Sequence, residues 1–295
     1  MYFHHKYIMQ KCFLIVLSFL GFVTTSAAQA PTEKTLLWQL SGKGIKEPSY
    51  LFGTIHLMCS GDLKMPQVVT EKFNDVTKLY LEIDMDDPNM MKEMMAGMQM
   101  KDSSTLEKLM GKKFDSVNAI FKTSTGMPLT MLNTAKPMLI MSMIYPSLLG
   151  CTPVSWESVF QTMAKEKSIE IKGLEKLQDQ INVFEKIPYK VQADMLEKML
   201  LNIDSAKMQF QEMLAVYKKK DINELNVLTT KEEDFGEYQD ILLSNRNRNW
   251  IPVIGEQAKK SPTFFAFGAG HMGGETGVIN LLRKAGFTVK PIFYE

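Results

Sequence analysis

Two stretches far apart in the chain most constrain how it can fold. Residues 49–56 read SYLFGTIH and residues 263–271 read TFFAFGAGH. In each, a run of β-prone, mostly apolar residues is stopped by glycine, which is typical of a buried strand that enters a tight loop. Each stretch therefore predicts a strand that ends just before a histidine, His56 in the first and His271 in the second.

The residues after each histidine follow the same order. A polar loop leads to a stretch with helical periodicity and then to a second apolar run, at residues 67–77 and 79–83 in the first case and 277–284 and 287–292 in the second. This order predicts two β-loop-α-β units, and hence an α/β fold with a mixed central sheet. Parallel strands place ligands beyond their carboxyl ends, so we expect His56 and His271 to share one site. Residues 36–44 predict a hairpin at the edge of the sheet.

The number of histidines supports a shared site. The chain has four, and His4 and His5 lie in a segment that we expect to be removed. The other two each follow a glycine by three positions, and neutral imidazole is a common metal ligand or base. The pair of GxxH motifs therefore indicates chemistry. The alternative is that each histidine caps a loop or hydrogen-bonds the backbone at a strand end.

Residues 1–28 are predicted to be a secretory signal peptide. Lys6 and Lys11 give a positive start, residues 12–24 form a short apolar core, and Ser26-Ala27-Ala28 fits a cleavage site before Gln29. An uncleaved membrane anchor is the alternative. Cleavage removes two of the 34 basic and none of the 33 acidic residues, which leaves a net charge of −1. We therefore expect one exported domain at residues 29–295, periplasmic or secreted, with no nucleic-acid partner.

Two cysteines remain after cleavage, Cys59 and Cys151. An even pair in an exported chain favours a disulfide, which would tie the loop after His56 to the region around Gly150. The alternative is two unpaired buried thiols, because spacing along the chain does not establish separation in space.

The apolar run at residues 79–83 carries two acids at its end, Glu82 and Asp84. Strand alternation places both on one side, and an acid is costly to bury without a partner. Glu82 is expected beside the strand that delivers His56, as the third ligand of a metal site. Two histidines and one carboxylate are a common open set for zinc, and similar sets hold manganese, cobalt or iron. A solvated strand end is the alternative.

Two further residues are candidates for catalysis. Glu175 follows a strand-like run at residues 168–175 and is expected to support the ligands or act as a general base; an acid at a helix start is the alternative. Arg246 and Arg248 are two of only three arginines and lie in the run NRNRN. Because a guanidinium binds carboxylates through two bonds, Arg246 or Arg248 is expected to orient a site carboxylate or stabilise an oxyanion. A structural ion pair is the alternative.

Residues 88–167 have helical periodicity and are expected to form a large helical insertion. Within them, methionines cover one helix face, at positions 90, 91, 94, 95 and 98. We expect this face to pack in an ordinary core. A pliable groove for peptide or lipid chains and capture of Cu(I) by thioethers are the alternatives.

The segments LLWQLSGKG, YLFGTIH, LYLEID, IKGLEKLQDQ, RNRNW and FFAFGAGHMGGETGVINLLRKAGFTVKPI together resemble the TraB/GumN family, which includes the TIKI proteins. The resemblance runs from about residue 36 to about residue 292. It implies a mixed α/β core related to erythromycin-esterase-like and haem-protein-like folds and, from the TIKI members, a metal-dependent protease. The positions that carry over are Gly53, His56, Glu82, Arg246, Gly268 and His271.

The sequence thus predicts an exported metal-dependent hydrolase, most nearly a peptidase, acting on a peptide or small acyl substrate. A divalent zinc, manganese or cobalt ion would be held by His56, His271 and Glu82. Glu82, Arg246 and Glu175 are the expected catalytic residues. The alternative from another class is a non-catalytic exported protein that sequesters a peptide, metal or haem with the same residues.

Overall fold

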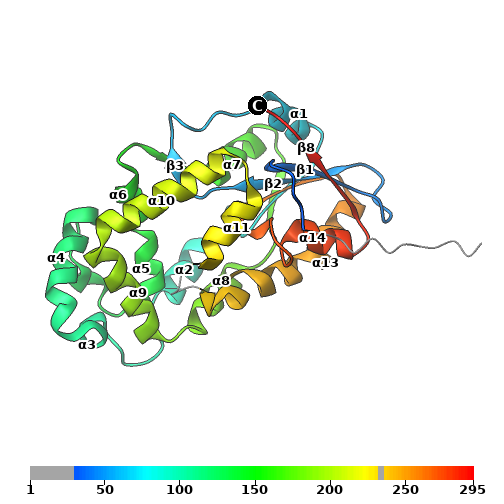
Figure 1. The fold of residues 1–295 in the computed structure, drawn as a ribbon. Coiled ribbons are helices and arrows are strands. Elements are labelled where there is room, and N and C mark those ends of the chain that lie inside the picture. Colours follow the sequence, from blue (N-terminus) through cyan, green and yellow to red (C-terminus); the bar gives the residue numbers. More distant parts are fainter. Residues whose placement is uncertain (1–29, 232–235) are drawn as a thin grey trace, which may run out of the picture.

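The computed structural model describes residues 30–231 and 236–295, and its centre is a six-stranded mixed sheet (Figure 1). The strand order is β6-β4-β7-β2-β1-β8. The strands are β1 (Leu37–Ser41), β2 (Ser49–Thr54), β4 (Lys78–Leu81), β6 (Glu170–Gly173), β7 (Thr263–Gly268) and β8 (Thr288–Ile292). The pairs β6-β4, β4-β7 and β7-β2 are parallel, whereas β1 is antiparallel to both β2 and β8. The predicted mixed α/β class is confirmed.

The two central strands are the two runs that precede the GxxH histidines. Every residue of β2 is buried, as is all of β7 except its last residue, as expected for strands covered on both faces. Their register pairs Gly53 with Phe267 and Thr54 with Gly268. Both strands therefore end at the same level, and their loops begin side by side.

Two predictions about neighbouring strands are wrong. β4 pairs with β7 rather than with β2, so Glu82 lies beside the strand that precedes His271 and not beside the one that precedes His56. β1 is not an edge strand, because the C-terminal strand β8 pairs with its free side. Apolar periodicity defines a strand but does not specify which distant segment pairs with it.

Helices cover both faces of the sheet. On one face Phe264 of β7 packs against Phe73 of α1 (Gln67–Asn74) and Phe160 of α7 (Trp156–Glu166). On the other, Phe267 packs against Trp250 of α13 (Asn245–Lys260), which contacts α14 (Val278–Lys284). Residues of opposite parity in β7 thus bury aromatic rings on opposite faces.

A helical lobe extends from one end of the sheet (Figure 1). Between β4 and β6 it contains α2 (Met90–Gly97), α3 (Leu106–Met110), α4 (Phe114–Thr125), α5 (Pro137–Ser142) and α6 (Tyr145–Leu149). Between β6 and β7 it contains α8 (Leu177–Glu185), α9 (Tyr189–Leu201), α10 (Ile203–Lys218) and α11 (Ile222–Lys231). The two sets pack together, since α9 contacts α3, α4 and α5 and α10 contacts α6. The lobe is therefore built from both segments and not from residues 88–167 alone.

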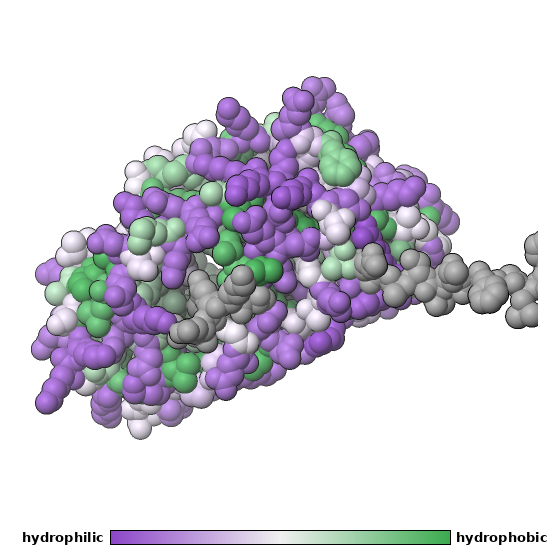
Figure 2. Space-filling view, in the orientation of Figure 1, coloured by the Kyte–Doolittle hydropathy of each residue, from purple (hydrophilic) through white to green (hydrophobic). Residues whose placement is uncertain are grey.

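The methionine face of α2 differs from the prediction. Met91 and Met95 are 67% and 61% exposed, and Gly97 is the buried residue of this helix. A Cβ at Gly97 would lie 2.3 Å from Ile181 Cδ1, so α2 reaches α8 through its glycine. The expectation that Met91 and Met95 pack in the core is wrong. The face of the molecule seen in Figure 2 is mainly hydrophilic, with hydrophobic side chains scattered over it.

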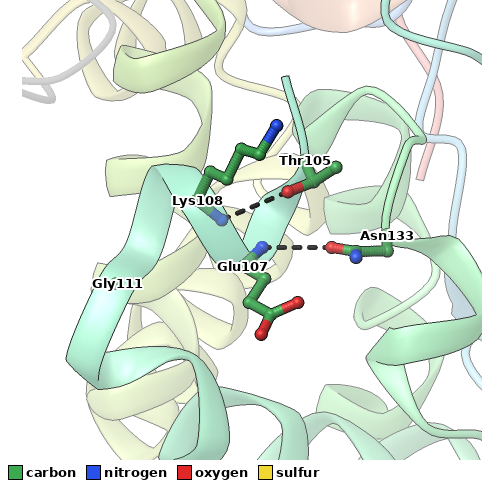
Figure 3. A pocket seen from close by; sticks show the side chains of 5 residues that line it. All are labelled: Thr105, Glu107, Lys108, Gly111 and Asn133. Carbon is green, nitrogen blue, oxygen red and sulfur yellow. Dashed lines mark hydrogen bonds between the residues drawn. The ribbon is translucent and has the colours of Figure 1, made fainter. Parts of the chain in front are cut away.

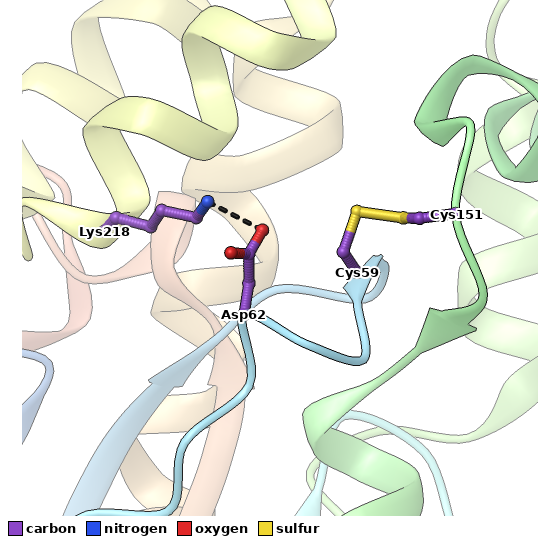
Figure 4. The surroundings of a disulfide bond; sticks show 4 residues. All are labelled: Cys59, Asp62, Cys151 and Lys218. Atoms are coloured by element: carbon purple, nitrogen blue, oxygen red, sulfur yellow. Dashed lines mark hydrogen bonds and ion pairs between the residues drawn. A yellow bond between two sulfur atoms is a disulfide. The ribbon is translucent and has the colours of Figure 1, made fainter.

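Cys59 and Cys151 form a disulfide, as predicted (Figure 4). Their Cα atoms are 5.6 Å apart, and β3 (Met58–Cys59) pairs with β5 (Pro153–Val154) next to the bond. Asp62 in the same loop forms an ion pair of 2.7 Å with Lys218 of α10. The loop that follows His56 is thus fixed to the segment that leads into α7.

The predicted signal peptide, residues 1–28, lies outside the described residues. Within residues 30–231 and 236–295, none of the helices combines the length and apolar character that a membrane crossing requires.

Candidate functional site

The three predicted ligands meet at the carboxyl ends of β2, β7 and β4. His56 Nε2 lies 3.8 Å and His271 Nε2 lies 3.9 Å from the same oxygen, Glu82 Oε1. The two ring nitrogens are therefore closer than the about 8 Å beyond which one ion, at bonds of about 2.1 Å, would not reach both. The loop after each strand delivers its histidine, while Glu82 directly follows β4.

Gly268 leaves the space between these three side chains open. A Cβ built on Gly268 would lie 3.2 Å from Glu82 Oε1, 3.5 Å from His56 Nε2 and 3.7 Å from His271 Cδ2. The Gly268 N–H also donates to Glu82 Oε1 over 2.9 Å. Gly53, the glycine of the other motif, has a packing role, because a Cβ there would lie 2.4 Å from Met272 Sδ. The two motif glycines therefore have different roles: Gly268 borders the site, and Gly53 allows close packing.

Arg246 occupies the same site with all of its N–H donors engaged. Its NH2 donates to Glu82 Oε2 over 2.5 Å and to Glu175 Oε1 over 2.6 Å, and its Nε donates to Glu175 Oε1 over 2.9 Å. Its NH1 donates to the Leu242 carbonyl over 3.2 Å and to His271 Nε2 over 3.1 Å. Leu242 lies in a π-helical turn, η3 (Asp240–Ser244), directly before α13. Such turns are frequent at functional sites.

Glu175 faces Arg246 rather than the open space by Gly268. Its second oxygen accepts the indole N–H of Trp250 over 3.1 Å, and only 9% of its side chain is exposed. The contacts assign it to holding Arg246 in place. Arg248, in contrast, is exposed and donates to Asn245 in its own helix.

Asp84 has a different partner from Glu82. β4 ends at Leu81, so the alternation does not continue, and Asp84 faces Lys172 of β6 at 3.8 Å. Glu82 Oε2 is instead contacted by Gln180 of α8 at 3.2 Å.

Each histidine has an oxygen partner at its other ring nitrogen. His56 Nδ1 lies 2.9 Å from Glu157 Oε1, which also accepts from the Thr54 hydroxyl over 2.6 Å. His271 Nδ1 lies 2.6 Å from Asn247 Oδ1. Partners of this kind orient histidines that bind metals.

Sequence reasoning missed Glu157 and Asn247. Glu157 is the second residue of α7, where an acid resembles an ordinary first-turn carboxylate. A signal was present, because positions 157, 160 and 164 share the buried stripe of this helix, and an acid on an apolar stripe needs a partner. Asn247 lies within the NRNRN run, where only the arginines had been considered.

The environment shifts the pKa values of the two histidines in opposite directions. Burial, with the charge of Arg246, lowers the pKa of His271 to about 3. Desolvation also acts to lower the pKa of His56, but the hydrogen bond and charge of Glu157 outweigh it and raise that pKa to about 9. Burial raises the pKa of Glu82, yet the charges of Arg246 and His56 and the hydrogen bond from the Gly268 N–H hold it well below its usual range. His56 is also the accessible member, with 67% of its side chain exposed against 6% for His271.

The donor chemistry of the site fits a divalent ion, with one rearrangement. Two imidazole nitrogens and a carboxylate oxygen surround the space that Gly268 leaves open. However, the described residues contain no group of three or more His, Cys, Asp or Glu side chains already placed to hold a metal ion. In addition, Arg246 NH1 donates to His271 Nε2 and so occupies its lone pair. An ion would bind His271 only after this donor withdraws.

A pocket of about 550 Å³ in the helical lobe is separate from this site (Figure 3). It is lined by Thr105, Glu107, Lys108, Gly111 and Asn133. Its polar groups bond one another, since Asn133 Oδ1 accepts from the Glu107 N–H and Thr105 Oγ1 from the Lys108 N–H. These hydrogen bonds cap the N-terminus of α3, so the polar groups of the pocket have a structural role.

The sequence was compared with known families, curated proteins and solved structures. The model of the TraB/PrgY/gumN family matches residues 36–291. No curated protein and no solved structure matches the chain. The matched range includes every residue of the site described above.

Proposed function

The chain belongs to the TraB/PrgY/gumN family, and we propose that it is a metal-dependent hydrolase of peptide or related acyl bonds. One observation carries the proposal. The Nε2 atoms of His56 and His271 both lie within 3.9 Å of one Glu82 oxygen, around a space that the motif glycine Gly268 leaves open.

In this proposal His56, His271 and Glu82 hold the ion, which is zinc, manganese or cobalt. When bound, a divalent ion supplies Lewis-acid polarisation of a carbonyl and a nucleophile at neutral pH. The protein's own residues orient these ligands: Glu157 accepts from His56 and the Gly268 N–H fixes Glu82 Oε1. His56 gives up its proton when it becomes a ligand.

Arg246 changes partners in this scheme. All five of its N–H groups are bonded within the protein, so none is free for a substrate. If His271 Nε2 binds the ion, it no longer accepts from Arg246 NH1, and one N–H of Arg246 is left without an acceptor next to the three ligands. That donor is then available to hold a developing oxyanion or a substrate carboxylate. Glu175, which accepts from Nε and NH2, retains the guanidinium in the site while NH1 withdraws from His271.

The second candidate is a non-catalytic protein that sequesters a peptide, metal or haem. The observation that favours it is the satisfaction of every Arg246 donor, because a closed ion-pair network is a common structural device. Binding without turnover distinguishes this candidate from the hydrolase.

The test uses full-length protein freed of metal by a chelator. A peptide library is incubated with wild type, His56→Ala, His271→Ala and Arg246→Lys, each with chelator and after addition of zinc, manganese or cobalt. Arg248→Lys is the matched control, because Arg248 is an exposed arginine of the same helix turn. Cleavage that requires metal, both histidines and Arg246 supports the proposal. Cleavage that survives chelation and both histidine substitutions refutes the metal mechanism, and metal binding without cleavage favours the sequestering protein.

We also propose that the chain is exported after cleavage before Gln29. The support is the charged start, apolar core and Ser26-Ala27-Ala28 run of the sequence. Intact-mass measurement of protein recovered outside the cytoplasm would show a chain that begins at Gln29. A mass that includes Met1 would contradict cleavage.

A further inference from the structure

Asn247 is the central residue of the NRNRN run, and the proposed function gives it no role. It lies in the first turn of α13 and is 2% exposed. Its Oδ1 is 2.6 Å from His271 Nδ1, and its Nδ2 is 2.9 Å from the Thr276 carbonyl oxygen. The side chain therefore bridges the histidine and the loop that follows it.

The partners of Asn247 determine which way its amide faces. The Thr276 carbonyl oxygen can only accept a hydrogen bond, so the atom that faces it must be the NH2 group. The carbonyl oxygen of Asn247 consequently faces His271 Nδ1. Because this oxygen can only accept, His271 Nδ1 must carry a proton.

Arg246 imposes the same arrangement from the other side of the ring. A guanidinium has donors and no acceptor, so His271 Nε2 must accept from Arg246 NH1 and must be unprotonated. Trp250 lies against the ring, with centroids 4.5 Å apart. Three residues of one helix, at positions 246, 247 and 250, thus fix the rotation and the tautomer of His271.

We propose that Asn247 is a positioning residue that holds His271 in the tautomer protonated at Nδ1, so that Nε2, which lies 3.9 Å from Glu82 Oε1, keeps its lone pair. The assignment of the tautomer stands on the hydrogen bonds alone. Its consequence for metal affinity rests on the proposed function.

The choice of an amide follows from the neighbouring charge. His56 is held by a carboxylate, Glu157, whereas His271 is held by a neutral oxygen. A carboxylate at position 247 would favour the imidazolium form, whose Nε2–H would point at the Arg246 guanidinium. It would also place an anionic oxygen against the Thr276 carbonyl. A neutral acceptor avoids both conflicts and leaves a lone pair in the site.

The experiment compares Asn247→Leu and Asn247→Asp with Asn249→Leu, a matched control at an exposed asparagine of the same turn. Long-range 1H–15N correlation spectra of full-length 15N-labelled protein at pH 7 report the protonation of each ring nitrogen. His271 is assigned by its absence from the spectrum of His271→Gln. Zinc chloride is then titrated into metal-free protein, and thermal unfolding is recorded for every variant.

In wild type we expect His271 to be protonated at Nδ1 and unprotonated at Nε2. Asn247→Leu leaves only Arg246 to set the tautomer, so a measurable fraction of the ring should become protonated at Nε2. Zinc binding should weaken about 10–100-fold, the usual effect of losing a partner of a metal-binding histidine. Asn247→Asp retains an acceptor and should keep the Nδ1 proton, while its charge favours a second proton at Nε2. Asn249→Leu should change neither property.

Two results would overturn the inference. One is a wild-type ring that is protonated at Nε2. The other is an Asn247→Leu protein that is folded and has an unchanged tautomer, whatever its zinc affinity. Failure of wild type to bind zinc, manganese or cobalt would instead refute the proposed function, while the spectra would still test the tautomer. If Asn247→Leu does not fold, Asn247→Asp decides: a ring without a proton at Nδ1 in this variant contradicts the inference.

Discussion

Replacing Gly268 with alanine should weaken metal binding while leaving the free energy of unfolding almost unchanged. The backbone at Gly268 has φ −50° and ψ 129°, which alanine adopts without strain. The new methyl would lie 3.2 Å from Glu82 Oε1, so this oxygen must move by a few tenths of an ångström, and 3.5 Å from His56 Nε2, an ordinary contact. Alanine also restricts the unfolded chain, which is worth about 0.4–1 kcal/mol in favour of folding. The free energy of unfolding should therefore stay within about 1 kcal/mol of wild type.

Metal binding should respond very differently. The methyl points into the space that His56, His271 and Glu82 surround, where an ion and its remaining ligands would lie. We expect zinc affinity to fall by about 100-fold, the upper end of the range for disturbing the surroundings of a metal site. Gly53→Ala is the matched control from the other GxxH motif. Its methyl would meet Met272 Sδ at 2.4 Å, and such overpacking costs about 1–3 kcal/mol.

Urea unfolding and zinc titration of metal-free protein measure both effects. Gly268→Ala should lose zinc and keep its stability, whereas Gly53→Ala should lose stability. A Gly268→Ala protein that binds zinc as tightly as wild type would refute the placement of the ion beside this glycine. Equal destabilisation by both substitutions would show that Gly268 is needed for packing.

Three further predictions concern residues that hold the site and the lobe. Arg246→Lys should lower the free energy of unfolding by about 1–3 kcal/mol and also lower the rate of peptide cleavage, because lysine cannot replace all the bonds to Glu175, Glu82 and the Leu242 carbonyl. Urea unfolding of Arg248→Lys is the control. Equal stability of the two variants would contradict a stabilising role for the Arg246 hydrogen bonds. Lys136 is 1% exposed, bonds the Gly97 and Gln99 carbonyls and pairs with Glu185 at 2.7 Å, so Lys136→Met should cost about 3–5 kcal/mol at pH 7 in denaturant titrations. Burial raises the pKa of Glu185, but Lys136 and Tyr189 together lower it below its ordinary 4.5. The stability that the Lys136–Glu185 pair contributes is therefore present above pH 4.5 and is lost as pH falls further. The difference in free energy of unfolding between Lys136→Met and wild type should narrow over that range. Cys59→Ser with Cys151→Ser opens a loop of sequence separation 92 and should cost about 4–5 kcal/mol, measured against oxidised wild type; an unchanged unfolding midpoint would show that the bond does not constrain the unfolded chain.

Several parts of the fold and site were predictable from local pattern. Residues 49–54 and 263–268 are strands because long apolar, β-prone runs stopped by glycine have few other ways to be buried. The delivery of His56 and His271 to one end of the sheet follows from the shared direction of these two strands. The pairing of Cys59 with Cys151 was expected from the even number of cysteines in a chain predicted to be exported.

The order of the strands and the partners of the charged groups depended on tertiary structure. β4 lies beside β7, and β8 pairs with β1, because pairing is decided by which surfaces pack together over long sequence separations. Met91 and Met95 remain exposed because α2 contacts the protein through Gly97, which helical periodicity alone does not reveal.

The same limit applies to the site. The sequence identified His56, Glu82, Arg246 and His271 as residue types suited to chemistry, but it could not show that Arg246 satisfies His271 Nε2 or that Asn247 faces Nδ1. Hydrogen bonds join atoms within about 3 Å, whereas these partners lie tens of residues apart along the chain. Residue identity and periodicity determine which groups are available and on which element they lie. Only the packing of the elements determines which of those groups meet and, through their donors and acceptors, which lone pairs remain free.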